Sequence, residues 1–279
     1  MGQNQPRVSI GIPQWQVLSY LLPCLRSIRK HSARYDVEVI VVDNGSQDES
    51  LDYLRSLDWI TLIERPQETR DNWPKNFFTG LDCALQAATG DFFMSVHTDV
   101  FVKSERWLDP FLREMEKDSQ IAATGAWKLE LSHPLYQLQK HVFGYATYKM
   151  KRLFGGRRRH IVWKQGDYPR DYCAMYRRQA ILDYNITFDS VNGWSGGGHS
   201  VAKQIWDAGF RMGMFPVREM GQHITHVTHG TAAVTPGRPL NHTRAQKKAE
   251  QRVKKLFNQP WVKELIADES LDGRKRAAA

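Results

Sequence analysis

Two carboxylates follow apolar runs that have the composition of buried β-strands. The β-branched run Val37–Val42 ends in an acidic, glycine-containing turn that carries Asp43 and Ser46. The apolar run Phe92–Val96 is followed in a similar way by Asp99. Strands buried on both faces are typical of parallel sheets, which bind ligands beyond the carboxyl ends of their strands. The two carboxylates therefore predict a nucleotide and a metal ion bound side by side.

Asp43 is the first candidate for contact with a nucleotide, because a carboxylate can accept hydrogen bonds from a base or a ribose. We expect Pro13 and Trp15 to form part of the opposite wall. A structural role is the alternative, in which Asp43 and Ser46 only cap the next turn or helix. Ser46 followed by Glu49 also matches a capping box. Capping by Ser46 and ligand contact by Asp43 can both hold.

Two basic residues follow the third predicted strand, in the segment ETRDNWPK. Arg70 and Lys75 could each meet a base or a phosphate group. They could equally be charges solvated on the surface. The spacing does not separate these two interpretations.

A run of histidines, His223, His226 and His229, recurs at every third position in GQHITHVTHGT. On an extended segment His223 and His229 would face one way and His226 the other. A structural zinc site normally has four ligands, and this run contains neither cysteine nor carboxylate. We therefore do not expect structural zinc here.

The elements that must position these residues alternate between strand and helix through about residue 102. Such alternation predicts an α/β protein with a mostly parallel sheet and right-handed crossovers. Strands are expected near Val8–Ile12, Val37–Val42, Ile60–Ile63 and Phe92–Val96, and helices near Val17–Lys30, Gln47–Ser56 and Lys75–Ala88. Later elements are helices near Trp107–Lys117 and Gly198–Ala208, strands near Ile121–Leu129 and Phe210–Phe215, and a charged helical segment over Arg244–Ile266.

Composition excludes several classes of protein. The chain has 279 residues, of which 41% are hydrophobic and 11% aromatic, so general disorder is not expected. No apolar run is long enough for a membrane span, and the first residues lack the apolar core of a secretory signal. The three cysteines, Cys24, Cys83 and Cys173, are widely spaced. They predict buried, reduced thiols and a cytoplasmic setting.

The formal net charge of +9 predicts an anionic partner, unless it reflects a generally basic surface. A nucleotide diphosphate, a lipid pyrophosphate, an anionic membrane and nucleic acid are the candidates. The insertion KHVFGYATYKMKRLFGGRRRHIVWK concentrates basic and aromatic residues. It could dock on an anionic membrane at its inner face, or serve as an acceptor-binding or oligomer arm. No recognised RNA-binding motif is present, so nucleic acid is not the expected partner.

An ordered set of motifs resembles the inverting family 2 glycosyltransferases of the GT-A fold. The resemblance covers roughly residues 8 to 230 and rests on the order of its parts. These parts are VSIGIP, VIVVDNGSQD, YCAMYRRQAI, Phe188-Asp189, Gly193-Trp194, Ala208-Gly209-Phe210 and Met214-Phe215-Pro216.

The resemblance implies a metal-dependent hexosyltransferase that uses a nucleotide-diphosphate sugar, UDP- or dTDP-linked, with Mn²⁺ or Mg²⁺. The acceptor would be a glycan or a lipid-linked sugar in surface polysaccharide, lipopolysaccharide or glycolipid assembly. Residues 1–103 would form the nucleotide-sugar half of one GT-A domain and residues 104–240 its acceptor-binding and catalytic half. Residues 241–279 would form a basic helical tail.

The metal motif departs from the pattern of the resembling family. His97-Thr98-Asp99 stands where Asp-x-Asp is expected, and the family implies that the final carboxylate, Asp99, contacts the metal directly. His97 could bind phosphate, contact the metal, or only fill space. Similar enzymes supply one later histidine to the metal or diphosphate, which implies His226 or His229.

The presumed catalytic base departs further. The resembling family carries a Glu-Asp pair before the helix that ends in Ala-Gly, where this chain has Gly197 and Gly198 followed by His199. A transfer with inversion needs a group that takes the acceptor proton, and His199 has a suitable pKa. Asp189 is the weaker alternative, and Trp194 is expected to bind acceptor with the two glycines. His199 could instead cap the helix.

The missing Glu-Asp pair leaves two other functions open. One is a catalytically weak protein that binds sugar nucleotides. The other is a basic RNA- or membrane-binding module built on the same fold.

Overall fold

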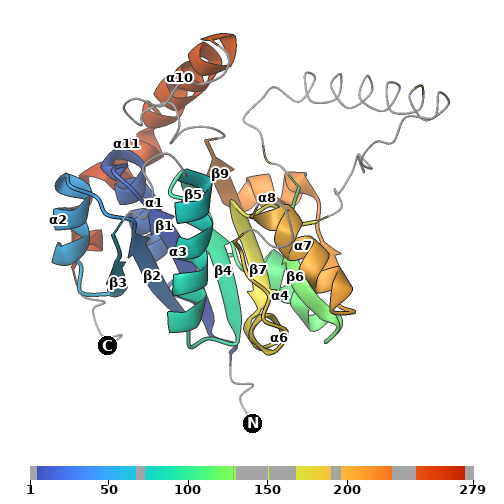
Figure 1. Cartoon of the computed structure of the whole chain (residues 1–279). Coiled ribbons are helices and arrows are strands. Elements are labelled where there is room, and N and C mark those ends of the chain that lie inside the picture. The colour runs from blue at the N-terminus through green and yellow to red at the C-terminus, as the bar shows by residue number, and fades with distance from the viewer. Residues whose placement is uncertain are drawn as a thin grey trace.

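The computed structural model of the chain describes residues 5–66, 73–127, 129, 150, 168–189, 196–227 and 243–273 (Figure 1). Within these residues the central sheet has seven strands in the order β3-β2-β1-β4-β7-β6-β8. They are β1 (Val8–Gln14), β2 (Val37–Asp43), β3 (Ile60–Glu64), β4 (Phe92–Val96), β6 (Ile121–Gly125), β7 (Cys173–Arg177) and β8 (Arg211–Met214). A smaller sheet pairs β5 (Val100–Val102) with β9 (Ile224–His226).

The first half of the sheet is parallel, as the alternating pattern predicted. β1 pairs with β2 and β4, and β2 pairs with β3. β7 instead runs antiparallel to its neighbours β4 and β6, while β8 is parallel to β6. The amino end of β7 therefore lies at the same edge of the sheet as the carboxyl ends of the other six strands.

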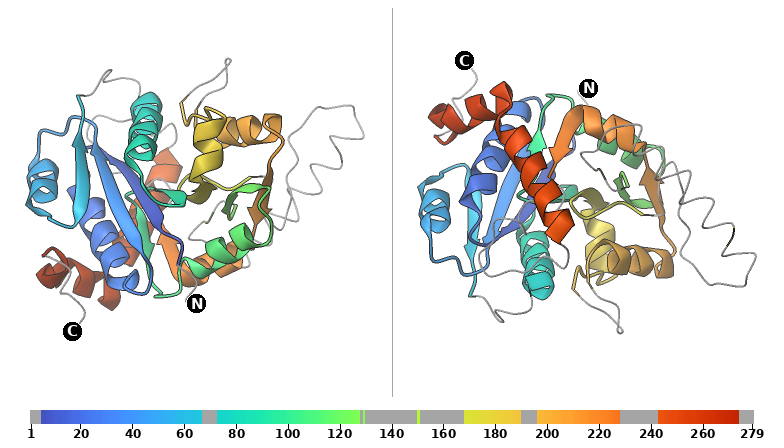
Figure 2. Two further views of the ribbon diagram at one scale, coloured as in Figure 1. Left: turned by 90° about the horizontal axis from the view of Figure 1, so that it is seen from below. Right: turned by 90° about the horizontal axis from the view of Figure 1, so that it is seen from above.

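Helices cover both faces of the sheet, which gives three layers (Figures 1 and 2). Alternate residues of β2 divide between two core clusters: Val39 and Val41 join one, Ile40 and Val42 the other. Burying each such side chain contributes about 1.5–3 kcal/mol. The first cluster includes side chains of α1 (Leu18–His31), α2 (Glu49–Ser56), α4 (Asp109–Glu116), α8 (Val217–His223), α10 (Thr243–Phe257) and α11 (Pro260–Ala267). The second includes α3 (Trp73–Ala87), α6 (Arg178–Asp183) and α7 (Gly198–Asp207).

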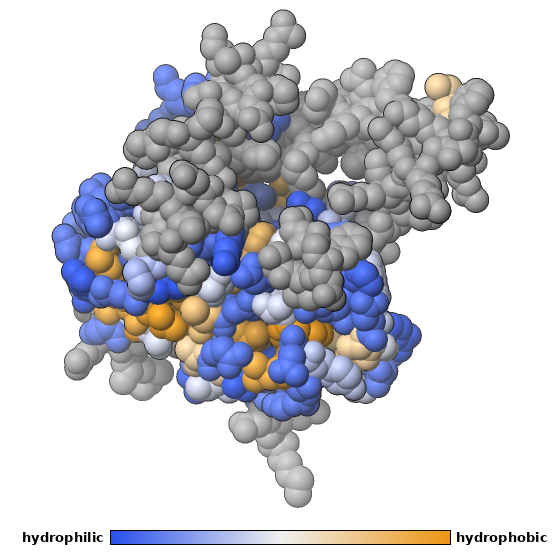
Figure 3. Space-filling view, in the orientation of Figure 1, coloured by the Kyte–Doolittle hydropathy of each residue, from blue (hydrophilic) through white to orange (hydrophobic). Residues whose placement is uncertain are grey.

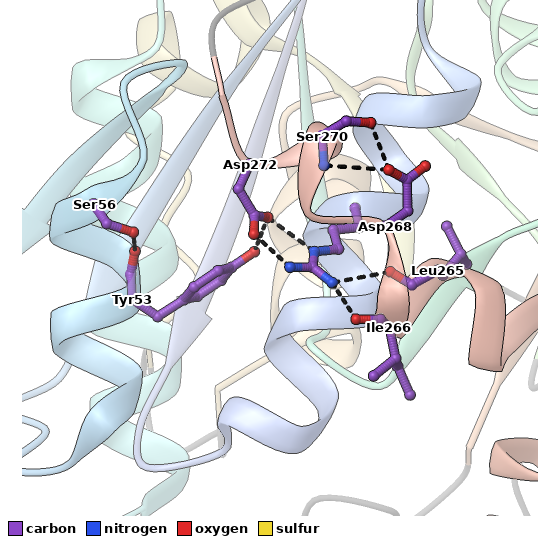
Figure 4. Close-up of polar contacts among 8 residues, drawn as sticks. Tyr53, Ser56, Leu265, Ile266, Asp268, Ser270 and Asp272 are labelled. Carbon is purple, nitrogen blue, oxygen red and sulfur yellow. Dashed lines mark hydrogen bonds and ion pairs between the residues drawn. The ribbon is translucent and has the colours of Figure 1, made fainter.

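A buried arginine of α1, Arg26, contacts α11 and the segment that follows it. Figure 4 shows the partners Leu265, Ile266 and Asp272. The Arg26 side chain, 3% exposed, forms an ion pair with Asp272 and donates to the backbone carbonyls of Leu265 and Ile266. Asp272 also accepts a hydrogen bond of 2.7 Å from the hydroxyl of Tyr53 on α2. This network fastens the segment around α11 onto the first two helices.

The predicted boundaries of one helical segment and one strand were wrong. The charged segment Arg244–Ile266 forms two helices, because α10 ends at Phe257 and α11 begins at Pro260. Proline lacks an N–H and is favoured in the first turn of a new helix. The strand expected over Ile121–Leu129 ends at Gly125.

The three cysteines carry free thiols. Cys24 and Cys173 are buried, as predicted, whereas Cys83 on α3 is half-buried. Burial raises the pKa of the Cys24 and Cys173 thiols, so both are protonated and unreactive near neutral pH.

Candidate metal and nucleotide site

Three segments converge where β4 ends. The antiparallel register pairs Val96 with Cys173, so the residues that precede β7 lie beside those that follow β4. The backbone N–H of His97 donates to the carbonyl of Tyr172 at 2.9 Å. In the smaller sheet, Val100 pairs with His226. The topology thus brings residues near positions 97, 172 and 226 to one point at the sheet edge.

The imidazoles of His97 and His226 lie on either side of the Asp99 carboxylate. Oδ1 of Asp99 is 3.5 Å from Nε2 of His226 and 3.9 Å from Nδ1 of His97. Possible ligand atoms from all three residues lie within 4.8 Å of one another. Imidazole nitrogen and carboxylate oxygen are ligands that divalent cations take in proteins. The donor set therefore fits a divalent metal ion.

Buried polar atoms without partners mark the same cluster. Among the described residues, Oδ1 of Asp99 and Nε2 of His97 are buried without a hydrogen bond. Burial alone would raise the pKa of Asp99, but the nearby imidazoles of His226 and His97 outweigh it and hold that pKa below its usual range. Burial lowers the pKa of His97, against the opposing charges of Asp171 and Asp99. The site thus offers an ionised carboxylate and a neutral imidazole.

Neighbouring groups fix the orientation of His226. The ring of Tyr172 stacks on it, with centroids 4.2 Å apart and planes inclined by 3°. Nδ1 of His226 is 3.4 Å from the carbonyl oxygen of Leu129. A hydrogen bond at one ring nitrogen sets which nitrogen is free to bind a metal. Nε2 is therefore directed to Asp99.

His223 and His226 do not lie on one extended segment, so the alternation of faces expected for such a segment does not apply to them. His223 is the last residue of α8, and His226 ends β9. The side chain of His226 is buried in the cluster, 8% exposed. His229 lies outside the described residues.

Asp43 is held from inside the protein. One carboxylate oxygen accepts a hydrogen bond from Nε2 of Gln14, the last residue of the neighbouring strand. The other accepts from the backbone N–H groups of Gly45 and Ser46, at 3.1 and 2.8 Å. Asp43 is 1% exposed. The structural role considered for this residue is therefore present.

Ser46 does not form the predicted capping box. Its hydroxyl accepts from the backbone N–H of Gln16 at 3.0 Å and from Nε2 of Gln14 at 3.1 Å. The N-cap of α2 is Asp48, whose carboxylate accepts from the backbone N–H of Ser50. Asp48 is adjacent to the helix and has two acceptor oxygens, so it takes the capping position in place of Ser46.

The remaining predicted nucleotide residues lie in different environments. Pro13 is buried in β1, where a Cβ added at Gly80 of α3 would lie 3.1 Å from it. Trp15 is half-buried just beyond β1, and Lys75 is exposed on α3. Arg70 lies outside the described residues.

Close backbone packing explains the glycines before α7. Gly197 has a φ of +90°, and a Cβ there would come within 2.6 Å of the Phe78 ring. The same Cβ would lie 3.0 Å from Oδ2 of Asp171, an oxygen that also accepts from the N–H of Gly198 at 3.4 Å. Side chains are thus excluded where α7 approaches α3 and the segment before β7. Trp194 lies outside the described residues.

The two predicted candidates for the base contact different elements. The ring of half-buried His199 is 5.5 Å from that of Tyr168. Asp189 lies against α3, with Oδ2 3.5 Å from the hydroxyl of Thr79. Its backbone N–H is fixed by the carboxylate of Asp82.

Residues 9–184 match the model of the family described as Glycosyl transferase family 2. This span is more than half of the chain. The chain belongs to glycosyl transferase family 2. The chain has the GT-A fold, and the candidate site lies at the carboxyl edge of its mostly parallel sheet.

Two relatives cover part of the glycosyltransferase. An uncharacterized glycosyltransferase of Haemophilus influenzae is 24% identical over 125 residues, which are 45% of this chain and 38% of that protein. The uncharacterized protein y4gI of Sinorhizobium fredii is 30% identical over 141 residues, 49% of this chain and 14% of that protein. The chain thus aligns with well under half the length of either relative.

Solved structures share the fold of the glycosyltransferase. The mannosyltransferase PcManGT of Pyrobaculum calidifontis, in complex with GDP-Man and Mn²⁺, has a TM-score of 0.54 at 17% identity, covering 95% of this chain and 74% of that one. S. aureus TarS in complex with UDP-GlcNAc has a TM-score of 0.51 at 13% identity, covering 95% and 71%.

Four residues at the candidate site were not predicted from the sequence: Gln14, Tyr20, Asp171 and Tyr172. Gln14 is the last residue of β1 and pairs with Asp43 in the parallel register, so its position was available from the strand pattern. Tyr20 is buried on α1, and burial together with the charge of Asp99 raises the pKa of its hydroxyl. The other two depend on the antiparallel pairing of β7.

Within the described residues of the glycosyltransferase, no helix has the length and hydrophobicity that crossing a bilayer requires. On the face shown in Figure 3, described hydrophobic residues occur in small groups among hydrophilic ones. Most of the basic aromatic insertion lies outside the described residues.

Proposed function

We propose that this glycosyltransferase moves a hexosyl group from a nucleotide-diphosphate donor to a hydroxyl of a glycan or lipid-linked acceptor, with inversion at the anomeric carbon. The observation that carries the proposal is the His97–Asp99–His226 cluster at the carboxyl edge of the sheet. Asp99 is 2% exposed and its Oδ1 lacks a hydrogen bond within the described structure. A buried, ionised carboxylate is costly unless it is paired or binds a cation.

Mn²⁺ or Mg²⁺ is the cofactor that this cluster would hold. When bound, such an ion neutralises the diphosphate and stabilises the departing nucleotide. Asp99 would supply the anionic ligand, and His226 a nitrogen that Tyr172 and a backbone carbonyl orient. His97 would offer a neutral imidazole to the metal or to a phosphate oxygen.

The ends of β1 and β2 would receive the nucleoside. Each carboxylate oxygen has two lone-pair sites, so Asp43 can accept a base N–H in addition to its internal donors. A uracil or thymine base has such an N–H, which favours UDP- or dTDP-sugars. Ser46, Pro13 and Trp15 would complete this part of the site. The two diphosphate sugars in the similar structures, GDP-Man and UDP-GlcNAc, agree with a nucleotide-diphosphate donor.

The remaining assignments follow the division of the domain into a donor half, 1–103, an acceptor half, 104–240, and a tail, 241–279. Arg70 and Lys75 would contact the donor phosphates. Trp194, Gly197 and Gly198 would contact the acceptor. His229 would be the alternative to His226.

The test is a panel of UDP-, dTDP- and GDP-linked sugars, assayed for binding and hydrolysis with Mn²⁺, with Mg²⁺ and with EDTA. We expect one donor to bind and to be hydrolysed slowly, in a way that EDTA abolishes. Hydrolysis that EDTA leaves unchanged would contradict the metal assignment. Absence of binding to every donor would contradict the proposed activity itself.

A catalytically weak sugar-nucleotide-binding protein is the second candidate. One observation favours it: α7 begins with Gly198 and His199, where relatives are expected to carry a Glu-Asp pair. This candidate predicts metal-dependent donor binding in calorimetry with no release of nucleotide diphosphate over hours.

A further inference from the structure

Asp171 lies beside the His97–Asp99–His226 cluster, although 72 positions separate it from Asp99 in the sequence. It precedes the antiparallel strand β7, and its carbonyl accepts a hydrogen bond of 2.8 Å from the hydroxyl of Ser95 on β4. The next carbonyl, of Tyr172, accepts from the N–H of His97. The backbone of Asp171 is therefore fixed next to the residues that lead into the cluster.

The side chain of Asp171 faces the start of α7. Its Oδ2 is 3.4 Å from the backbone nitrogen of Gly198, and it would lie 3.0 Å from a Cβ added at Gly197. The carboxylate is half-buried. The ring of the next residue, Tyr172, stacks on His226. Asp171 therefore connects the N-terminal end of α7 with the segment that packs on the His97–Asp99–His226 cluster.

We propose that Asp171 is the general base of the glycosyl transfer, supplying from β7 the carboxylate that α7 lacks. This inference rests on the proposed function. The carboxylate takes the proton of the acceptor hydroxyl while the acceptor oxygen bonds to the anomeric carbon. The bond from that carbon to the diphosphate oxygen breaks, and its electron pair leaves with the nucleotide diphosphate. Asp171 then releases the proton to solvent.

The proposed role of Asp171 explains why a glycine, Gly197, precedes α7. A side chain at Gly197 would crowd both Oδ2 of Asp171 and the ring of Phe78. The absence of a side chain at Gly197 therefore permits the close approach of the Asp171 carboxylate to the start of α7. His199, by contrast, packs near the ring of Tyr168, which meets that of Trp127 at 5.2 Å.

A purely structural role for Asp171 must be separated from catalysis. Gly197 is the N-cap of α7 and has no side chain, so Asp171 could serve only as a cap supplied from another segment. The variant Asp171→Asn separates the two, because an amide oxygen can still accept from Gly198 but cannot act as the base. Asp207→Asn, exposed near the other end of α7, is the matched control.

The experiment uses the full chain with Mn²⁺ and the donor from the panel of UDP-, dTDP- and GDP-sugars that the parental protein hydrolyses. We expect Asp171→Asn to keep donor affinity and melting temperature within about twofold and 2 °C. Turnover should fall about a hundred- to ten-thousand-fold, the usual contribution of a general base. Azide needs no deprotonation, so it should restore turnover in Asp171→Asn and give the glycosyl azide of inverted configuration.

Four results would overturn the assignment. Near-parental turnover by Asp171→Asn is one, and a loss of donor affinity that accounts for the lost turnover is another. A lower melting temperature with turnover kept would make Asp171 a cap. A loss of turnover in His199→Gln, with Asp171→Asn active, would return the role of base to His199. Because parental turnover is the reference, failure of the proposed function appears separately, as an inactive parent.

Discussion

Asp43 ends β2 and Asp99 lies just beyond β4, two parallel strands of one sheet that β1 separates. The two carboxylates are buried to a similar degree and have different surroundings. Asp43 is 1% exposed and Asp99 2%. Both oxygens of Asp43 accept hydrogen bonds, from Gln14 and from two backbone N–H groups. Oδ1 of Asp99 has no such donor in the described part of the chain and faces two imidazoles instead.

The comparison shows that burial does not decide what a carboxylate at a strand end is for. The donors around Asp43 satisfy its charge within the fold, and they hold the turn that follows β2. The imidazoles around Asp99 have nitrogen atoms that could bind a cation together with its carboxylate. Asp43 therefore contributes to stability in the absence of ligand, whereas the surroundings of Asp99 fit the proposed metal site.

The largest expected effect separates the two residues by metal binding. Asp99→Ala should weaken Mn²⁺-dependent binding of the sugar nucleotide by more than about a hundredfold, because a ligand is lost as well as its orientation of the histidines. Isothermal titration calorimetry with and without EDTA measures this. Asp52→Ala, a carboxylate 83% exposed on α2, is the control. If Asp99→Ala and the parent bind the sugar nucleotide with equal Mn²⁺-dependent affinity, this cluster is not the metal site.

Asp43→Ala should act on stability as well as on the donor. It leaves two backbone N–H groups without their acceptor and removes one of the acceptors of Gln14 Nε2, which keeps the Ser46 hydroxyl. The expected cost is about 2–4 kcal/mol in the free energy of unfolding. Nucleotide affinity should also fall when no metal is present. Urea unfolding and calorimetry in EDTA check both. Asp48→Ala, which removes only a helix cap, should cost about 1 kcal/mol. A cost for Asp43→Ala no larger than that would show that its internal hydrogen bonds contribute little.

Stabilisation of the protein by Mn²⁺ should depend on Asp99 and not on Asp43. At a concentration about a hundred times its Kd, Mn²⁺ should raise the free energy of unfolding by about 2.7 kcal/mol. The rise in melting temperature should persist in Asp43→Ala and disappear in Asp99→Ala. Thermal unfolding of the three proteins in matched Mn²⁺ and EDTA buffers makes the test. A shift that survives in Asp99→Ala would place the ion elsewhere.

A third carboxylate, that of Asp272, is held by an ion pair with Arg26. Burial would raise its pKa, but the hydrogen bond and charge of Arg26 outweigh burial and lower it. Its contribution to stability is therefore complete above the unfolded pKa of about 3.9 and is lost as the pH falls through the lower folded value. Asp272→Asn should cost about 1–2 kcal/mol at neutral pH and should flatten the decline in stability below about pH 4.

Urea unfolding at several pH values between 2 and 7 would measure this dependence on the Asp272→Asn protein and its parent. Asp183→Asn, exposed on α6, serves as the control. Parallel stability curves for Asp272→Asn and the parent would contradict the assigned role of the ion pair.

The parallel half of the fold could be read from the sequence because its signals are local. Runs such as Val37–Val42 are apolar on both faces, and helical segments of suitable length separate them. The family resemblance implied Asp99 as a metal ligand and either His226 or His229 as another, and the residue types alone did not rank the two histidines. Gln14 could have been found by extending the first strand by two residues past Ile12, to the partner of Asp43.

The antiparallel strand β7 marks the limit of that reasoning. No local pattern tells that Cys173 pairs with Val96, and only that pairing brings Asp171 and Tyr172 to the cluster. The error at Ser46 has a different origin, because two acceptors competed for one helix start and the sequence did not rank them. Pro260 indicated a break between two helices. The prediction missed it because the residues on both sides have helical periodicity.

The Arg26–Asp272 tie has a consequence for how the polypeptide acquires its shape during synthesis. The two residues are 246 positions apart. At about 5–20 residues per second, roughly 12 to 50 seconds pass between the synthesis of the first and that of the second. Throughout that interval the guanidinium of Arg26 has neither its counter-charge nor the two carbonyls of α11. One face of α1 therefore stays uncovered during synthesis until α11 and Asp272 have been made and can pack on it.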